Sequence, residues 1–173
     1  MLRDIKIGSN VIGKNHPAYI IAEAGVNHNG KLDIALELIR NAKKIGANCI
    51  KFQTFKADAV VTKDAPKADY QLKVKALELS FDSYQTILEE CKSVGVDFLS
   101  TPYNKEDVDF LMELGVNAFK IASGQLIELD FLKYVAGKKL PIILSTGMGT
   151  LSEVSRAVET IRGEGNEEIV LLQ

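Results

Sequence analysis

The chain has 173 residues, enough for one domain with a substantial apolar core. Hydrophobic residues make up 46% and charged residues 25%, and the formal net charge is −2. Proteins that bind nucleic acid or an anionic membrane usually have a positive net charge or a basic patch, and this net charge gives no sign of either. No apolar run is long enough to span a bilayer, and residues 1–6 lack the apolar stretch of a signal peptide. We therefore expect neither kind of partner.

The sequence first predicts a β-hairpin, with strands at Ile5–Ile7 and Val11–Ile12 around a Ser9-Asn10 turn, that caps one end of the fold. Six short, mostly apolar strands follow. They are expected at Tyr19–Ala22, Cys49–Gln53, Phe98–Ser100, Ala118–Ile121, Ile142–Ser145 and Ile169–Leu172. Apolar strands without polar alternation, separated by helices, are typical of a parallel sheet covered on its outer face.

The helices between these strands carry their own signals. Residues 34–42 have one apolar face, Asn104 is a candidate N-cap, and Thr150–Glu153 has the pattern of a capping box. Three helices end at a glycine, Gly46, Gly95 or Gly115, because the residue after a helix usually needs a positive φ.

Regular alternation of strands and helices, without a dinucleotide-binding glycine fingerprint, favours a TIM (β/α)8-type barrel over a doubly wound sheet. Such a barrel has eight strands, whereas about six are expected here, so the predicted α/β barrel is incomplete in this chain. The connection Thr54–Leu79 is long for a barrel loop and contains Lys56, Lys63, Asp64 and Lys67. It is either a lid over a polar substrate or a solvated surface loop.

The two cysteines, Cys49 and Cys91, lie in a strand-like and a helix-like apolar run, without paired spacing. Buried thiols of this kind fit a reducing compartment better than a disulfide framework. We therefore expect a cytoplasmic protein.

In a TIM barrel, polar residues at the carboxyl ends of the strands point into the active site. An unpaired ammonium inside a barrel costs several kcal/mol, so Lys51 and Lys120, which interrupt apolar strands, each need an anion. Either both lysines bind a phosphate or carboxylate ligand, or one forms an internal salt bridge, as Lys51 would with Glu23. Ser145–Gly149, directly before a capped helix, supports an anion site.

Glu23 itself either balances lysine charge or acts as a base or water-orienting carboxylate. His28 is a candidate metal ligand, although a lone histidine is more often a structural residue. His16 lies far away in the hairpin, so the chain supplies no histidine-rich metal site.

Five motifs together resemble the N-acetylneuraminate synthase family, which includes legionaminic and pseudaminic acid synthases and spore-coat polysaccharide relatives. In family order they are Glu23–Gly30, Ile50–Thr54, Ser100–Tyr103, Lys120–Gly124 and Leu144–Met148. The resemblance runs from about Tyr19 to Gln173. It implies a transferase that condenses phosphoenolpyruvate with the open-chain aldehyde of an N-acylated amino sugar, giving a sialic-type acid and phosphate.

The resemblance also implies roles for individual residues. The catalytic residues would be Glu23, Lys51 and Lys120, with both lysines binding phosphoenolpyruvate and Glu23 handling a metal-bound water or the aldehyde proton. The residues expected to bind or orient substrate are Asn27, Gln53, Thr101, Ser123, Ser145 and Thr146.

The family pattern differs from this sequence in two respects. Gln125 stands where the family often has an acidic residue, which questions strict N-acetylmannosamine chemistry. The family's divalent metal, usually manganese, is held by two histidines beyond Gln173, and an antifreeze-like C-terminal domain also follows there. We therefore expect residues 1–173 to be the N-terminal part of such a barrel, without metal ligands and inactive alone.

Three other interpretations stay open. The chain belongs to another phosphoenolpyruvate-dependent aldolase-type sugar-acid synthase, or it is a non-catalytic anion-binding fragment. Alternatively, it has a structural role in which copies pair through open strand edges. A homodimer or other homo-oligomer is expected in any case.

Overall fold

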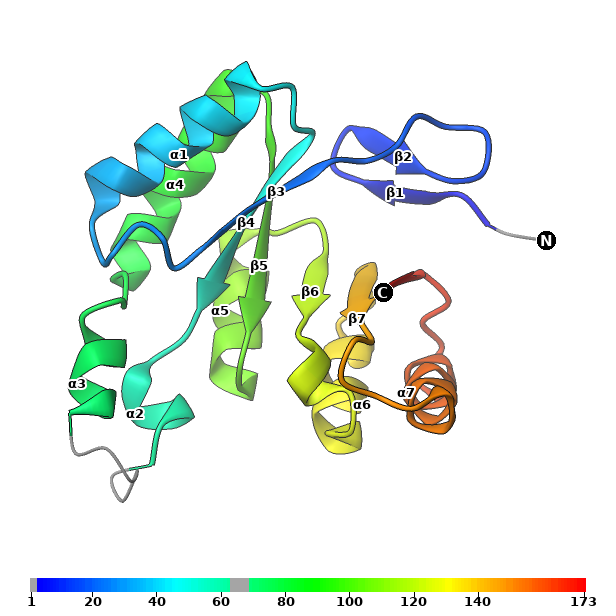
Figure 1. The fold of residues 1–173 in the computed structure, drawn as a ribbon. Helices are drawn as coiled ribbons and strands as arrows, with labels where there is room; N and C mark the ends of the chain where they lie inside the picture. The colour runs from blue at the N-terminus through cyan, green and yellow to red at the C-terminus, as the bar shows by residue number, and fades with distance from the viewer. Residues whose placement is uncertain (1–2, 63–68) are drawn as a thin grey trace.

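The computed structural model describes residues 3–62 and 69–173 (Figure 1). The chain begins with a hairpin, β1 (Ile5–Ile7) and β2 (Asn10–Ile12). The strands that follow are β3 (Ile21–Gly25), β4 (Cys49–Thr54), β5 (Asp97–Pro102), β6 (Phe119–Ile121), β7 (Ile142–Ser145) and β8 (Ile169–Leu172). The helices are α1 (Leu32–Lys44), α2 (Ala57–Val60), α3 (Tyr70–Lys75), α4 (Phe81–Val94), α5 (Lys105–Leu114), the 3-10 turn η1 (Ser123–Gln125), α6 (Leu129–Gly137) and α7 (Leu151–Gly163).

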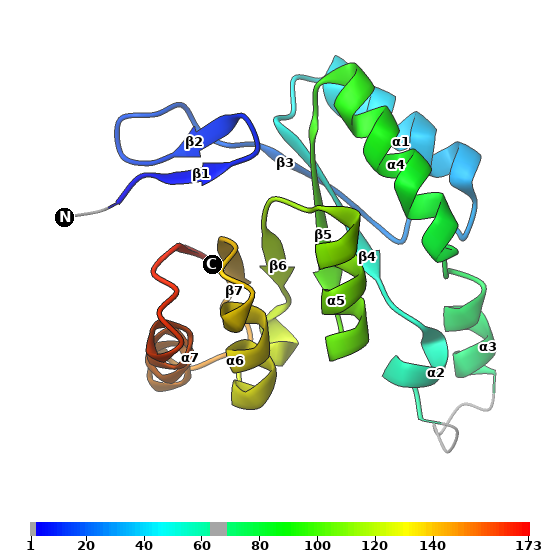
Figure 2. The same ribbon diagram turned by 180° about the vertical axis from the view of Figure 1, so that it is seen from behind.

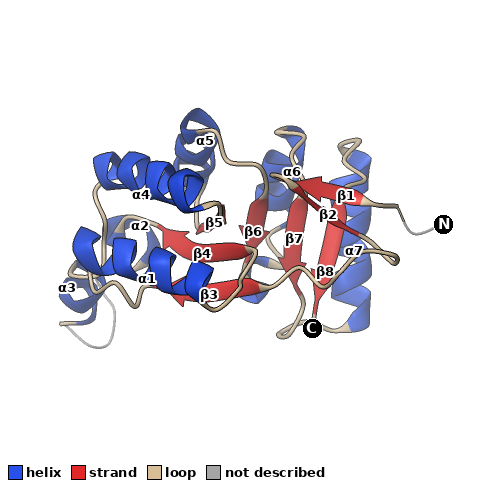
Figure 3. Ribbon diagram, turned by 90° about the horizontal axis from the view of Figure 1, so that it is seen from above, coloured by secondary structure: helices blue, strands red, loops and turns tan. Residues whose placement is uncertain are grey.

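Strands β3 to β8 run parallel and in sequence order. They form two three-stranded sheets, β3-β4-β5 and β6-β7-β8, and β6 lies against β5, so that all six strands follow one curved row (Figure 3). Among the described residues, β3 pairs with β4 alone and β8 with β7 alone, so the row does not close. The expected α/β barrel architecture with six parallel strands is confirmed.

Helices cover the outer face of this row (Figure 2). Helices α1 and α4 lie side by side over β3, β4 and β5, whereas α6 and α7 lie together over β6, β7 and β8. Apolar side chains fill the space between strands and helices, among them Phe52, Phe98, Phe119, Ile121 and Leu144. Burial of this apolar surface is the main force that holds the helices against the strands.

The inner face of the row changes character from one end to the other. At the amino ends of the strands, Cys49, Leu99 and Ile143 pack against Ile5 and Ile7 of the hairpin. The hairpin therefore covers the amino end of the open barrel, as predicted, and Figure 1 shows its place there. The polar inward-facing residues are left at the carboxyl ends, where function resides in barrels.

The predicted helix ends are confirmed in detail. The Asn104 side chain accepts a hydrogen bond from the Asp107 N–H at 2.8 Å, and Thr150 and Glu153 form a complete capping box. Gly95 and Gly115 end their helices in the left-handed region, with φ of 72° and 83°.

Three expectations about local structure need correction. The first barrel strand runs from Ile21 to Gly25 and not from Tyr19, so Glu23 lies within it. The hairpin turn falls at Gly8–Ser9, because Ile7 pairs with Asn10. The long connection contains α2 and α3 and is therefore not a simple loop, while Lys63, Asp64 and Lys67 lie outside the described residues.

Both cysteines are buried and unpaired with each other. Burial raises the pKa of the Cys91 thiol to about 12 and also raises that of Cys49, so neither is a reactive thiolate at neutral pH. Within the described residues, none of the helices combines the length and apolarity needed to cross a membrane.

Candidate active site

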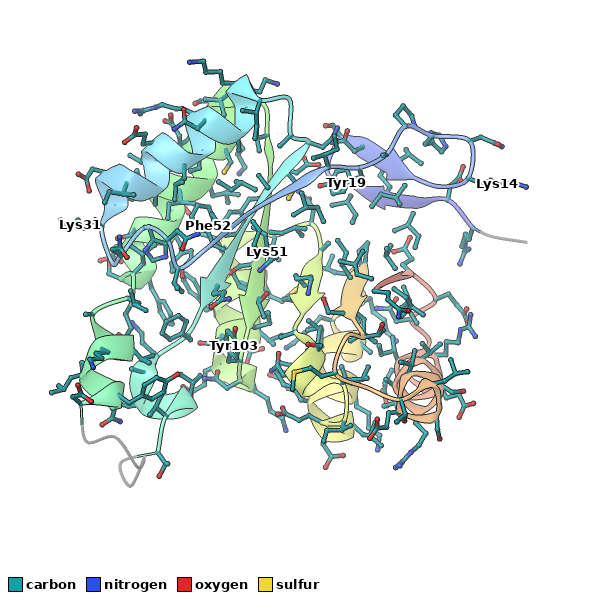
Figure 4. All side chains as sticks on the ribbon, viewed as in Figure 1. Lys14, Tyr19, Lys31, Lys51, Phe52 and Tyr103 are labelled. Atoms are coloured by element: carbon teal, nitrogen blue, oxygen red, sulfur yellow. The ribbon has the colours of Figure 1, made fainter. Side chains whose placement is uncertain are left out.

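A group of polar residues lies on the inner face at the carboxyl ends of β3 to β7. Because side chains alternate along a strand, the outward-pointing Phe52 is flanked by the inward-pointing Lys51 and Gln53. Figure 4 shows this alternation, with Phe52 on the side of α1 and α4 and Lys51 on the opposite side. The site therefore follows from strand periodicity and from the register of β4 with its neighbours.

Lys51 is one of two buried cations in this group, with 5% of its surface exposed. Its Nζ lies 2.8 Å from Glu23 Oε1 and donates a hydrogen bond to Thr101 Oγ1 at 3.4 Å. Glu23 and Lys51 are direct neighbours in the β3–β4 register, which places the two side chains side by side. The internal salt bridge considered for this lysine is therefore present.

Lys120 is the second buried cation, with 7% of its surface exposed. Its Nζ donates hydrogen bonds to Ser145 Oγ at 2.5 Å and to the backbone oxygen of Ile121 at 2.8 Å. Burial, assisted by the nearby charge of Lys51, lowers the pKa of the Lys120 ammonium to about 8, while Glu23 opposes this change. Both lysines therefore share one electrostatic environment.

A β-bulge directly follows Glu23 in β3. The β3–β4 register shifts between Glu23 and Gly25, and Gly25 has a φ of 54°. A Cβ at Gly25 would lie 3.4 Å from Glu23 Oε1 and 3.9 Å from Gln53 Nε2. The glycine thus allows both the backbone conformation and the close approach of the carboxylate.

The remaining predicted residues are placed differently. Gln53 is half-buried beside Gly25, whereas Asn27 is exposed in the turn after β3. Ser123 begins the η1 turn that follows β6. Thr146 uses both its N–H and its Oγ1 to bond the backbone oxygen of Leu172, at 2.9 and 3.0 Å. The hydrogen bonds of Thr146 therefore tie the β7–α7 loop to β8 and not to the lysines.

Two residues that follow strands, and to which the sequence assigned no catalytic or binding role, also lie at this end of the barrel. Tyr103 follows β5 (Figure 4), and burial together with the charge of Glu23 raises the pKa of its phenol. Gln125 is 5% exposed, its Nε2 donates to the Tyr103 backbone oxygen at 3.4 Å, and its Oε1 is buried without a partner. The position of Tyr103 after a strand would have identified it by the rule that found Thr101.

The two histidines do not form a metal centre. His28 is buried, its Nδ1 accepts a hydrogen bond from the Gly30 N–H at 3.0 Å, and its ring packs near Phe52. His16 pairs with Asp4 in the loop after the hairpin. Across residues 3–62 and 69–173, no three His, Cys, Asp or Glu side chains gather as a metal site, so these residues do not fit the divalent metal implied by the resemblance.

Taken together, the site is a buried pair of ammonium groups with adjoining hydroxyls and one carboxylate. Lys51 and Lys120 provide two positive charges, Thr101 and Ser145 provide oxygens on them, and Glu23 provides a negative charge. Buried cations fixed in this way suit a ligand with more than one anionic group, because fixed dipoles and charges act strongly where water is excluded.

Comparisons with known proteins identify a family for this chain. A profile of the NeuB family matches residues 38–173. The N,N'-diacetyllegionaminic acid synthase of Legionella pneumophila is 45% identical over 161 residues, which cover 87% of this chain and 45% of that protein. The spore coat polysaccharide biosynthesis protein SpsE of Bacillus subtilis is 39% identical over 96% of this chain and 47% of its own length.

Solved structures show the same fold. The crystal structure of N-acetylneuraminic acid synthetase from Leptospira borgpetersenii matches with a TM-score of 0.91 and 32% identity, over 99% of this chain and 59% of that one. The chain spans about half the length of the curated relatives it matches. With a family profile that covers most of its residues, this chain belongs to the NeuB family.

Proposed function

We propose that the chain provides the phosphoenolpyruvate-binding part of a nonulosonic acid synthase. The observation that carries the proposal is the pair of buried lysines, Lys51 on β4 and Lys120 on β6, which are close enough for the charge of Lys51 to lower the pKa of Lys120. Ser145, at the end of β7, accepts a hydrogen bond from Lys120. Phosphoenolpyruvate has a phosphate and a carboxylate, so its two anionic groups match two fixed cations. The legionaminic acid synthase of Legionella, at 45% identity, supports the same reaction class.

The proposed reaction joins phosphoenolpyruvate to an open-chain N-acylated amino sugar. The enol carbon forms a C–C bond to the aldehyde carbon, and a proton ends on the new hydroxyl. Water adds to the neighbouring carbon, and the C–O bond to phosphate breaks, releasing inorganic phosphate and leaving a 2-keto acid.

In this scheme Lys51 and Lys120 hold the anionic groups, and the Ser145 hydroxyl, which accepts from Lys120, fixes the orientation of that ammonium. Glu23 is the carboxylate that accepts a proton from the attacking water. Thr101 positions Lys51 from β5. These roles belong to the chain's own side chains, and no step is assigned to a metal because the described residues hold no fitting ligand group.

Calorimetric titration of phosphoenolpyruvate tests the proposal, with circular dichroism to show that each variant is folded. Lys51→Ala and Lys120→Ala should each weaken binding about 10- to 100-fold, because each removes a buried charge-assisted hydrogen bond. Lys44→Ala, which removes an exposed lysine at the end of α1, is the control and should bind like the parent chain. Unchanged affinity in both site variants would exclude the proposed anion site.

A further inference from the structure

The two lysines of the candidate site are not equivalent. Glu23 Oε1 lies 2.8 Å from Lys51 Nζ, so this cation is already neutralised from within the protein. The contacts that the structure gives for Lys120 within the described residues are neutral oxygens, those of Ser145 and Ile121. A ligand anion can therefore reach Lys120 directly, but it must compete with Glu23 for Lys51.

Glu23 is able to give way. Its side chain is 61% exposed, whereas the side chain of Lys51 is 6% exposed, so the lysine is fixed and the carboxylate is not. Gly25 places no side chain against the carboxylate, whereas a Cβ there would be in van der Waals contact with Glu23 Oε1, at 3.4 Å. A largely exposed carboxylate regains water when it leaves its partner, so the cost of breaking this pair falls on the buried Lys51, which an incoming anion then neutralises.

We propose that Glu23 is an internal competitor for Lys51, and that phosphoenolpyruvate displaces it. This inference rests on the proposed function. The ligand's anionic oxygens replace the Glu23 carboxylate on Lys51, and the carboxylate turns to the open side of the site, next to the bound ligand. Glu23 thus has two positions, one as a counter-ion in the empty site and one as a free carboxylate in the complex.

One consequence follows from the charges. With Glu23 in place the group has two positive charges and one negative charge, so a simple monoanion is satisfied at Lys120 alone. Only a ligand with two anionic groups gains from displacing the carboxylate. The site therefore selects phosphate esters that also have a carboxylate over either group alone.

Calorimetric titration of phosphoenolpyruvate into the parent chain, Glu23→Gln and Glu23→Asp tests this inference. Glu23→Gln should bind about two- to tenfold tighter, because an amide does not compete as an ion for Lys51. Glu23→Asp keeps the charge but is shorter by one methylene, so it should also bind tighter than the parent. Glu128→Gln, which removes an exposed charge just before α6, is the matched control and should leave affinity unchanged.

Titrations with inorganic phosphate give a second readout, because a single anionic group can be held at Lys120 alone. Glu23→Gln should raise the affinity for phosphoenolpyruvate by a larger factor than the affinity for phosphate. If Glu23→Gln binds no tighter while Lys51→Ala still loses binding, Glu23 does not compete and the proposed anion site stands. If Glu23→Asp binds like the parent while Glu23→Gln binds tighter, simple repulsion accounts for the effect and the displacement is refuted. If the folded lysine variants bind like the parent, or no folded chain binds, the proposed function and this inference fall together.

Discussion

The Lys120 ammonium is buried beside the charge of Lys51, and these two influences lower its pKa to about 8. Below that pH the group is charged and can hold an anion, and above it the charge is lost. We therefore predict that affinity for phosphoenolpyruvate falls between pH 7 and pH 9, by about tenfold for each pH unit at most. A bound anion raises the pKa of Lys120, so the affinity declines from the pKa of the free site, about 8, and levels off only above the higher pKa of the complex.

Calorimetry across this pH range measures the effect, and Lys120→Arg is the informative variant. A guanidinium stays charged at pH 9. If the Lys120→Arg variant folds, its affinity for phosphoenolpyruvate should therefore change little between pH 7 and pH 9. An affinity of the parent chain that does not change from pH 7 to pH 9 would contradict the role of Lys120 as an anion ligand.

His28 gives a second prediction at the scale of the residue. Burial lowers the pKa of its imidazole, and its Nε2 is buried without a partner, so the folded protein holds the ring neutral. The pKa is thus lower in the folded chain than in the unfolded chain, and unfolding takes up a proton as pH falls below about 6.5. The free energy of unfolding should therefore decrease there, by at most about 1.4 kcal/mol per pH unit from this group.

Urea unfolding at pH 7.5 and pH 5.5 measures this loss, compared between the parent chain and two variants. His28→Gln should lower stability at both pH values and reduce the difference between them. His16→Gln, which changes an exposed histidine after the hairpin, should keep the pH dependence of the parent. Equal pH dependence in the parent and His28→Gln would assign the effect to other groups.

The hairpin is the element on which closure of the amino end depends. Asp97 at the start of β5 accepts hydrogen bonds from Asn10 at 2.7 Å and from Tyr19 at 2.8 Å, which tie the hairpin to the barrel strands. Gly8 makes this possible, because it has a φ of 57° and a Cβ there would overlap Asp97 Oδ1. We predict that Gly8→Ala destabilises the protein by about 2–4 kcal/mol, from backbone strain and this clash together.

The matched control is Gly46→Ala, at a glycine with a φ of 83° and nothing within 4 Å of the added Cβ. Gly46→Ala introduces the backbone strain without the clash, so it should lower the free energy of unfolding by only about 1 kcal/mol. Urea unfolding of both variants isolates the contact with Asp97. Equal losses in the two variants would show that the hairpin adapts and does not depend on this contact.

Most elements could be predicted from the sequence because their signals are local. The runs that became β4 to β8 are short, apolar and preceded by helix ends, and each was placed within two residues of its observed bounds. The start of β3 was less clear, since Tyr19 looks like a strand residue but its phenol instead reaches Asp97. The bulge at Gly25 left no local pattern, as it depends on pairing with β4.

The candidate site was predictable to the extent that it depends on strand periodicity. Lys51 and Lys120 stand out because each is a charge within an apolar strand, and the barrel rule places both on the inner face. The partners of each lysine are a tertiary property. Glu23 forms an ion pair with Lys51, and Thr146 forms a hydrogen bond with the backbone of Leu172. Both contacts join neighbouring strands, so no local sequence pattern specifies them.

At the scale of the whole molecule, the edges of the strand row decide how copies of the chain behave. Within the described residues, β3 and β8 each pair with one neighbour, and Leu171 and Leu172 on β8 are 48% and 37% exposed. Unpaired N–H and C=O groups beside exposed leucines favour pairing with another strand. We predict that the chain self-associates in a concentration-dependent manner, and that Leu171→Lys shifts the equilibrium toward the monomer.

Sedimentation velocity over a range of protein concentrations measures this equilibrium. Leu151→Lys is the control, because Leu151 is more exposed than Leu171, at 86%, but lies at the start of α7 and not on a strand edge. If the edge drives association, Leu171→Lys should dissociate the oligomer and Leu151→Lys should not, since a charge disrupts strand pairing only where strands meet. If both variants dissociate the oligomer equally, the contact between copies is an apolar surface on the α7 side and not the strand edge. A chain that is monomeric at all concentrations would rule out both contacts.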